Sequence, residues 1–180
     1  MMKSFCIAGL LLLVQNLAWA DSSTDNESMD PKMDNQRLQG LIEHIAGNIE
    51  GSPGFWQFDM DGFKTSVITD EEADRMRIIV PVATLEGIDS DRLYRIMQAN
   101  FDSALDARYS IAKGVLWSAY IHPLSILSDH QFVDALAQTV NLAATYGTTY
   151  SSGALIFSQG DSQGEQNKHY QEIIERENSI

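Results

Sequence analysis

The hydrophobic period of this sequence changes several times along the chain, and these changes limit the folds that it can adopt. In some stretches apolar residues recur every three or four positions, which is typical of an amphipathic helix. In others apolar and polar residues alternate, which is typical of a half-buried strand. The helical period occupies residues 34–49, 90–105 and 128–143, and the strand period occupies 55–82 and 108–121.

Turn signals divide the two strand stretches into five strands. Asp61-Gly62 and Lys113-Gly114 are typical of tight turns, and the acidic run 70–74 is a third turn. Pro81 has no amide hydrogen, so it belongs near the end of its strand or at a sheet edge. Consecutive hairpins predict an antiparallel sheet. The order α-β-β-β-α-β-β-α therefore predicts a single α+β domain with a five-stranded antiparallel sheet.

The three expected helices differ in how clearly their ends and faces are marked. Asp34 or Asn35 can cap the first helix, and Ser128 with Gln131 forms a capping box at the start of the last. The middle helix has an apolar stripe along one side. This stripe consists of Leu93, Ile96, Met97, Phe101 and Leu105.

The α+β domain is expected to cover residues 34–158. A polar stretch without periodicity precedes it over 21–33 and is typical of a flexible linker. The tail over 159–180 is also polar. Within this tail Tyr170, Ile173 and Ile174 have the spacing of a short amphipathic helix.

Residues 1–20 have the pattern of a secretory signal peptide. Lys3 gives a positive start, residues 5–17 are almost wholly apolar, and Ala18-Trp19-Ala20 has small residues where a signal peptidase reads them. We therefore expect cleavage after Ala20 and a periplasmic or secreted protein, without stable membrane insertion after cleavage. An uncleaved membrane anchor is the alternative, although a span needs about 20 apolar residues.

Removal of the signal peptide changes the chemistry of the remaining chain. It takes away Cys6, the only cysteine, so no disulfide and no thiolate metal site can form. The formal charge falls from −13 to about −14, because Lys3 is lost as well. A surface this acidic repels phosphate backbones, so nucleic-acid binding is not expected. The acidity favours solubility, and an acidic groove for a basic partner is the alternative.

The sequence contains no recognisable catalytic, metal or cofactor motif. Asp59-Met60-Asp61-Gly62 resembles the start of a calcium loop, but Lys64 and Asp70 occupy the sixth and twelfth positions, where glycine and glutamate are needed. Neither a nucleophile elbow nor a glycine-rich phosphate loop is present. The histidines are not spaced as metal pairs; they are His44, His122, His130 and His169. We therefore predict no catalytic residue, metal ion or cofactor.

Aromatic residues in the strands are the candidate binding residues. They are Phe55, Trp56, Phe58, Trp117 and Tyr120. Because successive strand residues point to opposite faces, Trp56 and Phe58 share one face and Phe55 takes the other, while Trp117 opposes Tyr120. If helices cover one face only, the apolar groups on the other face mark a partner site or a dimer interface. Cover by the linker, the tail or a second copy is the alternative.

Several segments, in this order of elements, resemble the bacterial YbjN family, which shares the fold of the type III secretion chaperones. The resembling segments lie within about residues 34–147; they are 55–58 with Gly62, 76–82, 106–111, 115–117, 121–124 and the helix from Ser128. The resemblance implies a binding, chaperone-like module that is often dimeric and has no cofactor. Those relatives are typically cytoplasmic, whereas this chain carries an export signal.

Two functions follow from these observations. The first is an exported, non-enzymatic module that binds a protein or peptide and forms a homodimer. The alternative is a small-molecule-binding protein or an enzyme of unrecognised class in the periplasm. An open apolar sheet face or groove would favour the first function. A closed pocket with converging carboxylates or histidines would favour the second.

Overall fold

A computed structural model describes residues 32–102, 104–147 and 166–177 of the 180-residue chain. The predicted signal peptide, and all of the predicted linker except Lys32 and Met33, lie outside the described residues. So do residues 148–165, which join the predicted domain to its tail.

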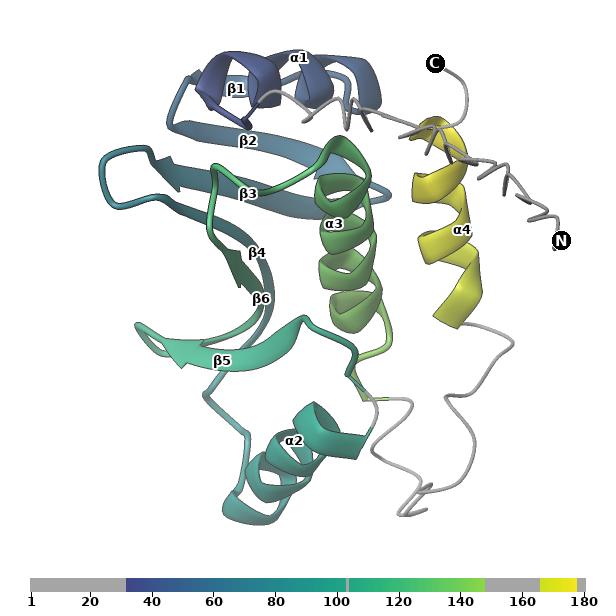
Figure 1. Ribbon diagram of the computed structural model, residues 1–180. Coiled ribbons are helices and arrows are strands. Elements are labelled where there is room, and N and C mark those ends of the chain that lie inside the picture. Colours follow the sequence, from purple (N-terminus) through teal and green to yellow (C-terminus); the bar gives the residue numbers. More distant parts are fainter. Residues whose placement is uncertain (1–31, 103, 148–165, 178–180) are drawn as a thin grey trace, which may run out of the picture.

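The described residues form one antiparallel sheet with helices on one of its faces (Figure 1). The elements are α1 (Asn35–Ile45), β1 (Glu50–Ser52), β2 (Phe55–Met60), β3 (Phe63–Asp70), β4 (Arg75–Thr84), α2 (Ser90–Asp102), β5 (Arg108–Ala112), β6 (Val115–His122), α3 (Asp129–Ala144) and α4 (Gln166–Glu177). The strand order is β1-β2-β3-β4-β6-β5. The predicted α+β class and antiparallel sheet are confirmed.

The sheet has six strands, so the prediction of five is wrong. The additional strand is β1, whose three residues are all exposed and show no alternation of apolar and polar residues. Its backbone pairs with β2, and a side chain at Gly51 would place its Cβ 2.1 Å from the carbonyl oxygen of Phe55. Sequence periodicity detects burial, and β1 buries nothing that could reveal it.

The two predicted turns that contain glycine are confirmed. Asp61 and Gly62 have φ values of 54° and 83°, and Lys113 and Gly114 have φ values of 52° and 73°. Two consecutive positive φ values define the turn that matches the twist of antiparallel strands. The Asp59 carboxylate accepts a hydrogen bond from the amide of Gly62 (2.9 Å), so Asp59 closes the turn.

Pro81 lies within β4, where it pairs with Trp117 of β6 on one side and has no β3 partner on the other. The pairing of β4 with β3 extends only as far as Ile79, and the register with β6 shifts between Pro81 and Ala83. Pro81 therefore occupies a bulged stretch where the strand has already left β3. A missing amide hydrogen costs little at such a position.

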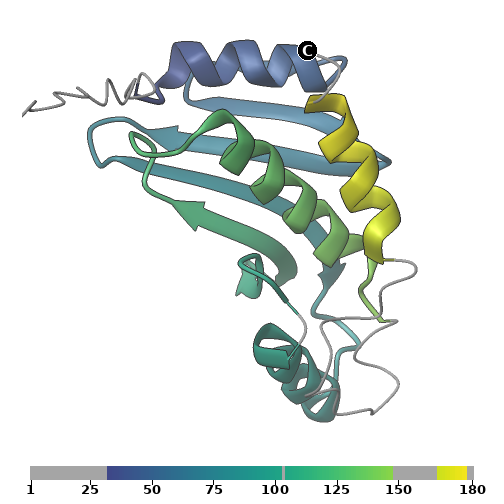
Figure 2. The same cartoon turned by 45° about the vertical axis from the view of Figure 1, so that its right-hand side comes forward.

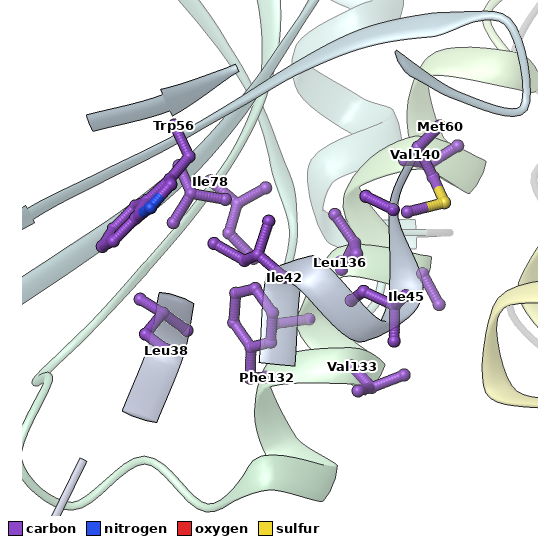
Figure 3. Packing of buried hydrophobic residues seen from close by; sticks show 14 of the residues in the cluster. Leu38, Ile42, Ile45, Trp56, Met60, Ile78, Phe132, Val133, Leu136 and Val140 are labelled. Carbon is purple, nitrogen blue, oxygen red and sulfur yellow. The ribbon is translucent and has the colours of Figure 1, made fainter. Parts of the chain in front are cut away.

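The main core lies between the sheet and helices α1, α3 and α4 (Figure 3). Trp56 and Phe132 are its largest fully buried side chains, and the Trp56 indole donates a hydrogen bond to the side-chain oxygen of Gln39. Helix α3 is buried along most of its length. Ser128 and Gln131 cap it reciprocally, as predicted, at 3.2 and 2.9 Å. Asp34 caps α1.

A second, smaller core cluster lies beneath α2 at the β5 end of the sheet. Ile96 and Ala99 of α2 pack there with Tyr109 and Leu116. Within the described ranges, no helix combines the length and the apolar composition that crossing a membrane requires.

Candidate functional site

No described helix covers the second face of the sheet, and apolar side chains run across it. One row of paired residues crosses four strands; it consists of Phe55, Ile68, Arg77 and Ile121. Phe55 and Ile121 are 47% and 58% exposed. Ile79 lies in the next row beside Ala119, and Trp117 lies opposite Pro81. We call this surface the open face; its members are Phe55, Ile68, Arg77, Ile79, Pro81, Trp117 and Ile121.

The open face carries positive charge although the chain as a whole is acidic. Its outer pairs are neutralised in the sheet register, with Asp59 opposite Lys64 and Asp70 opposite Arg75. Arg77, in contrast, has the aliphatic residues Ile68 and Ile121 as its cross-strand neighbours. An exposed arginine between two isoleucines suits a ligand that presents both an apolar surface and a carboxylate.

The structure divides the predicted aromatic residues between the two faces. Phe55 and Trp117 lie on the open face. Trp56 and Phe58 lie on the helix-covered face and are 0% and 3% exposed, which corrects their assignment as binding residues. Both are core residues because β2 alternates under α1 and α3, and their side chains fill the core. The predicted alternation of faces within β2 is correct.

Tyr120 also lies on the covered face, where it packs against both core clusters. Its ring stacks on His122, with centroids 6.1 Å apart. Burial, together with the nearby carboxylates of Asp106 and Asp134, raises the pKa of the Tyr120 hydroxyl. Tyr120 thus connects the two clusters and does not contribute to the open face.

A second exposed apolar surface lies on α2. Tyr94, Met97 and Phe101 are spaced by three and four residues, and their exposed fractions are 66%, 42% and 80%. Leu105, in the loop that follows, is 57% exposed, and Ile111 of the neighbouring strand is 46% exposed. We call these five residues the α2 stripe. Met97, Phe101 and Leu105 belong to the predicted apolar stripe of residues 90–105, but they are exposed because α2 packs through Ile96 and Ala99.

The side-chain amide of Asn100 links α2 to the outer edge of β5. It accepts a hydrogen bond from the amide of Tyr109 (2.7 Å) and donates one to the carbonyl of Tyr109 (3.1 Å). The Tyr109 hydroxyl donates to the carbonyl of Leu142 on α3 (2.8 Å). Without Asn100, the backbone amide and carbonyl of Tyr109 at the outer edge of β5 would be open to another strand. Residues of the α2 stripe are therefore exposed beside a strand edge that is already occupied.

Several acidic side chains of the described residues connect separate parts of the fold through hydrogen bonds and ion pairs. Hydrogen bonds from the backbone amide (2.7 Å) and hydroxyl (3.1 Å) of Ser125 lower the pKa of Asp74, and so tie the β3–β4 turn to the loop before α3. Asp61 forms an ion pair with Arg176 of α4 at 2.5 Å. Among the described residues, no group of three or more histidines, cysteines or carboxylates has the arrangement of a metal site.

Comparison with known proteins finds similarity to solved structures. No protein-family model matches the chain, and no curated protein sequence matches it significantly. The structure is similar to a chain of the HopA1–SchA chaperone–effector complex, with 13% identity, a TM-score of 0.49, and coverage of 62% of this chain and 94% of that chain. It is also similar to a chain of the complex between the Yersinia pestis type III secretion chaperone SycH and a stable fragment of YscM2. In that case the identity is 21%, the TM-score is 0.47, and the coverage is 62% and 97%. The resemblance to the YbjN family stays a prediction.

Proposed function

We propose that this chain is an exported, non-enzymatic module that binds an extended protein or peptide segment on its open face. The observation that carries this proposal is the row of apolar side chains around Arg77 on a sheet face that no described helix covers. Large apolar side chains gathered on an exposed face mark interaction surfaces. A peptide with apolar residues and a carboxylate would match Ile68, Ile121 and the guanidinium between them.

A peptide-binding experiment with a matched control tests this function. Peptides selected from a random library on the wild-type protein should bind the Ile121→Asp variant at least tenfold more weakly, which corresponds to about 1.4 kcal/mol. Ile126→Asp is the control, because Ile126 is 69% exposed but lies in the loop before α3 and not on the open face. Equal losses in the two variants, or no selectable peptide, would count against the open face.

We also infer that the protein forms a homodimer through the α2 stripe. Helix α2 contains both signs of charge beside its apolar residues, since Asp91, Arg95 and Asp102 are interspersed along it. A two-fold axis makes such a surface self-complementary, because the acidic and basic positions of one copy meet those of the other. Asn100 occupies the β5 edge at Tyr109, so this contact would be made by side chains and not by strand addition.

Light scattering during size exclusion tests the dimer. The wild-type protein should elute as a dimer, and the Met97→Asp variant as a folded monomer, because a carboxylate in an apolar interface loses its hydration. Ile126→Asp again provides the matched exposed control and should remain dimeric. A monomeric wild-type protein would remove the dimer from the proposal and leave the open face as its basis.

A further inference from the structure

The C-terminal helix α4 packs on the helix-covered side of the molecule against α3, α1 and the β2–β3 turn, and we call the surface that it covers the groove. Helix α4 runs along α3 (Figure 2). Ile173 is completely buried there, and Tyr170 and Ile174 pack beside it against the main core. An amphipathic helix that lays its apolar side into a groove is a common mode of peptide recognition.

Two carboxylates determine which helix can enter this groove. Asp134 of α3 accepts a hydrogen bond from the Tyr170 hydroxyl, and its other oxygen accepts one from the side-chain amide of Gln138 (2.7 Å). Asp61 of the β2–β3 turn forms the 2.5 Å ion pair with Arg176, which also contacts the Met60 sulfur at 2.8 Å. A helix that binds in this groove therefore needs a hydroxyl at the position of Tyr170, two apolar residues at those of Ile173 and Ile174, and an arginine at that of Arg176.

The stability of α4 depends on its contacts with the rest of the domain, as that of a bound helical peptide depends on its receptor. A helix of 12 residues is marginal in water without tertiary contacts. Among residues 170–176 of α4, whose side chains are described, Ile173 alone is fully buried. Residues 145–165 separate α4 from α3 along the chain, and this covalent attachment makes the docking of α4 an intramolecular step. Elements held in this way open at a lower free energy than the global fold.

We propose that this groove is a helix-binding site, that α4 is its resident occupant, and that an amphipathic helix of a partner protein binds there by displacing α4. The partner helix carries a hydroxyl, an apolar pair and an arginine at the spacing of Tyr170, Ile173, Ile174 and Arg176. Charge favours this partner, since both polar positions of the groove are carboxylates on an acidic protein. The site is separate from the open face and does not depend on the function proposed above.

Titration with a labelled peptide tests the proposal on the intact protein. The probe is a fluorescent peptide with the sequence of residues 166–180, and its anisotropy is measured against wild-type, Arg176→Ala and Ile173→Asp proteins. The peptide should bind the Ile173→Asp protein at least tenfold more tightly than the wild type, because the resident α4 no longer competes. Arg176→Ala should give an intermediate affinity. A control peptide with the Ile173→Asp change should not bind.

Arg176→Ala keeps the test decisive if Ile173→Asp does not fold. The Arg176 side chain is 40% exposed, so its loss weakens α4 docking and leaves the core cluster filled. Equal peptide affinity for the wild-type and Arg176→Ala proteins would overturn the proposal, as would absence of binding to folded Arg176→Ala protein. Binding that appears only together with a doubled mass would indicate exchange of α4 between two copies, and would overturn the partner helix as the occupant.

Discussion

At the scale of single residues, Tyr170 offers a pH-dependent test of the α4 contact. Burial, together with the hydrogen bond to Asp134 and the charge of that carboxylate, raises the pKa of Tyr170 to about 12. A raised pKa means that the folded state favours the protonated hydroxyl. The stabilisation is therefore complete below the ordinary value of 10.0 and is lost as the pH rises through about 12.

The measurement compares urea unfolding of the wild-type protein with that of Tyr170→Phe at two pH values. At about pH 8 the wild type should be the more stable protein, and by about pH 11 the difference should shrink. Phenylalanine keeps the ring and removes only the titrating hydroxyl, so loss of packing cannot produce this pH dependence. A difference that is constant across this range would show that the hydrogen bond to Asp134 is not formed in solution.

Some contacts of single residues could be predicted from the local sequence alone. Ser128 and Gln131 satisfy each other through local chemistry, so four residues of sequence were enough to predict their capping box. The separation of Phe55 from Trp56 followed from strand geometry alone. The strand also indicates which face is buried, because Phe55 shares its face with the polar residues Gln57 and Asp59, whereas the face of Trp56 is wholly apolar.

At the scale of elements, Asn100 is expected to hold α2 against β5. The Asn100→Ala change removes two hydrogen bonds to the backbone of Tyr109 and should lower the free energy of unfolding by about 2 kcal/mol, since each bond contributes about 1 kcal/mol. Chemical denaturation measures this loss. Gln98→Ala is the matched control on the same helix and should change the stability by less than about 0.5 kcal/mol.

The elements also show why part of the candidate site could not be predicted. Helix α2 carries apolar residues around more than half of its circumference, so its period fits burial of either side. In the folded protein Ile96 and Ala99 are buried, and Tyr94 and Met97 are exposed. Ile68 was missed because it shares the phase of its strand with the polar residues Lys64, Ser66 and Asp70. Only pairing across strands brings Ile68 and Ile121 beside Arg77.

At the scale of the whole molecule, the net charge opposes the association that the α2 stripe favours. Two copies with a formal charge of −13 each repel at low salt, whereas the contact between their apolar side chains is insensitive to screening. Raising sodium chloride from about 20 mM to about 300 mM should therefore strengthen dimerisation several-fold. Sedimentation velocity measures the change. A dimer that weakens with salt would indicate that ion pairs dominate the interface.

The whole molecule also depends on its predicted route out of the cytoplasm. Replacing Leu12 with lysine interrupts the apolar run that a signal peptide requires. The variant should accumulate in the cytoplasm with residues 1–20 retained, while the wild type should be found outside it and begin at Asp21. Cell fractionation and N-terminal sequencing measure both properties. Ser4→Lys, outside the run, is the control and should be processed normally.

The two edges of the sheet affect how readily the protein aggregates at high concentration. At one margin β1 is only three residues long and contains Gly51, and at the other Asn100 holds the outward backbone groups of Tyr109. A sheet grows into fibrils by recruiting strands at an open margin. One edge strand is short, and at the other edge the Asn100 amide occupies the backbone groups of Tyr109. This fold can therefore expose apolar side chains for a partner without offering its backbone as a template for aggregation.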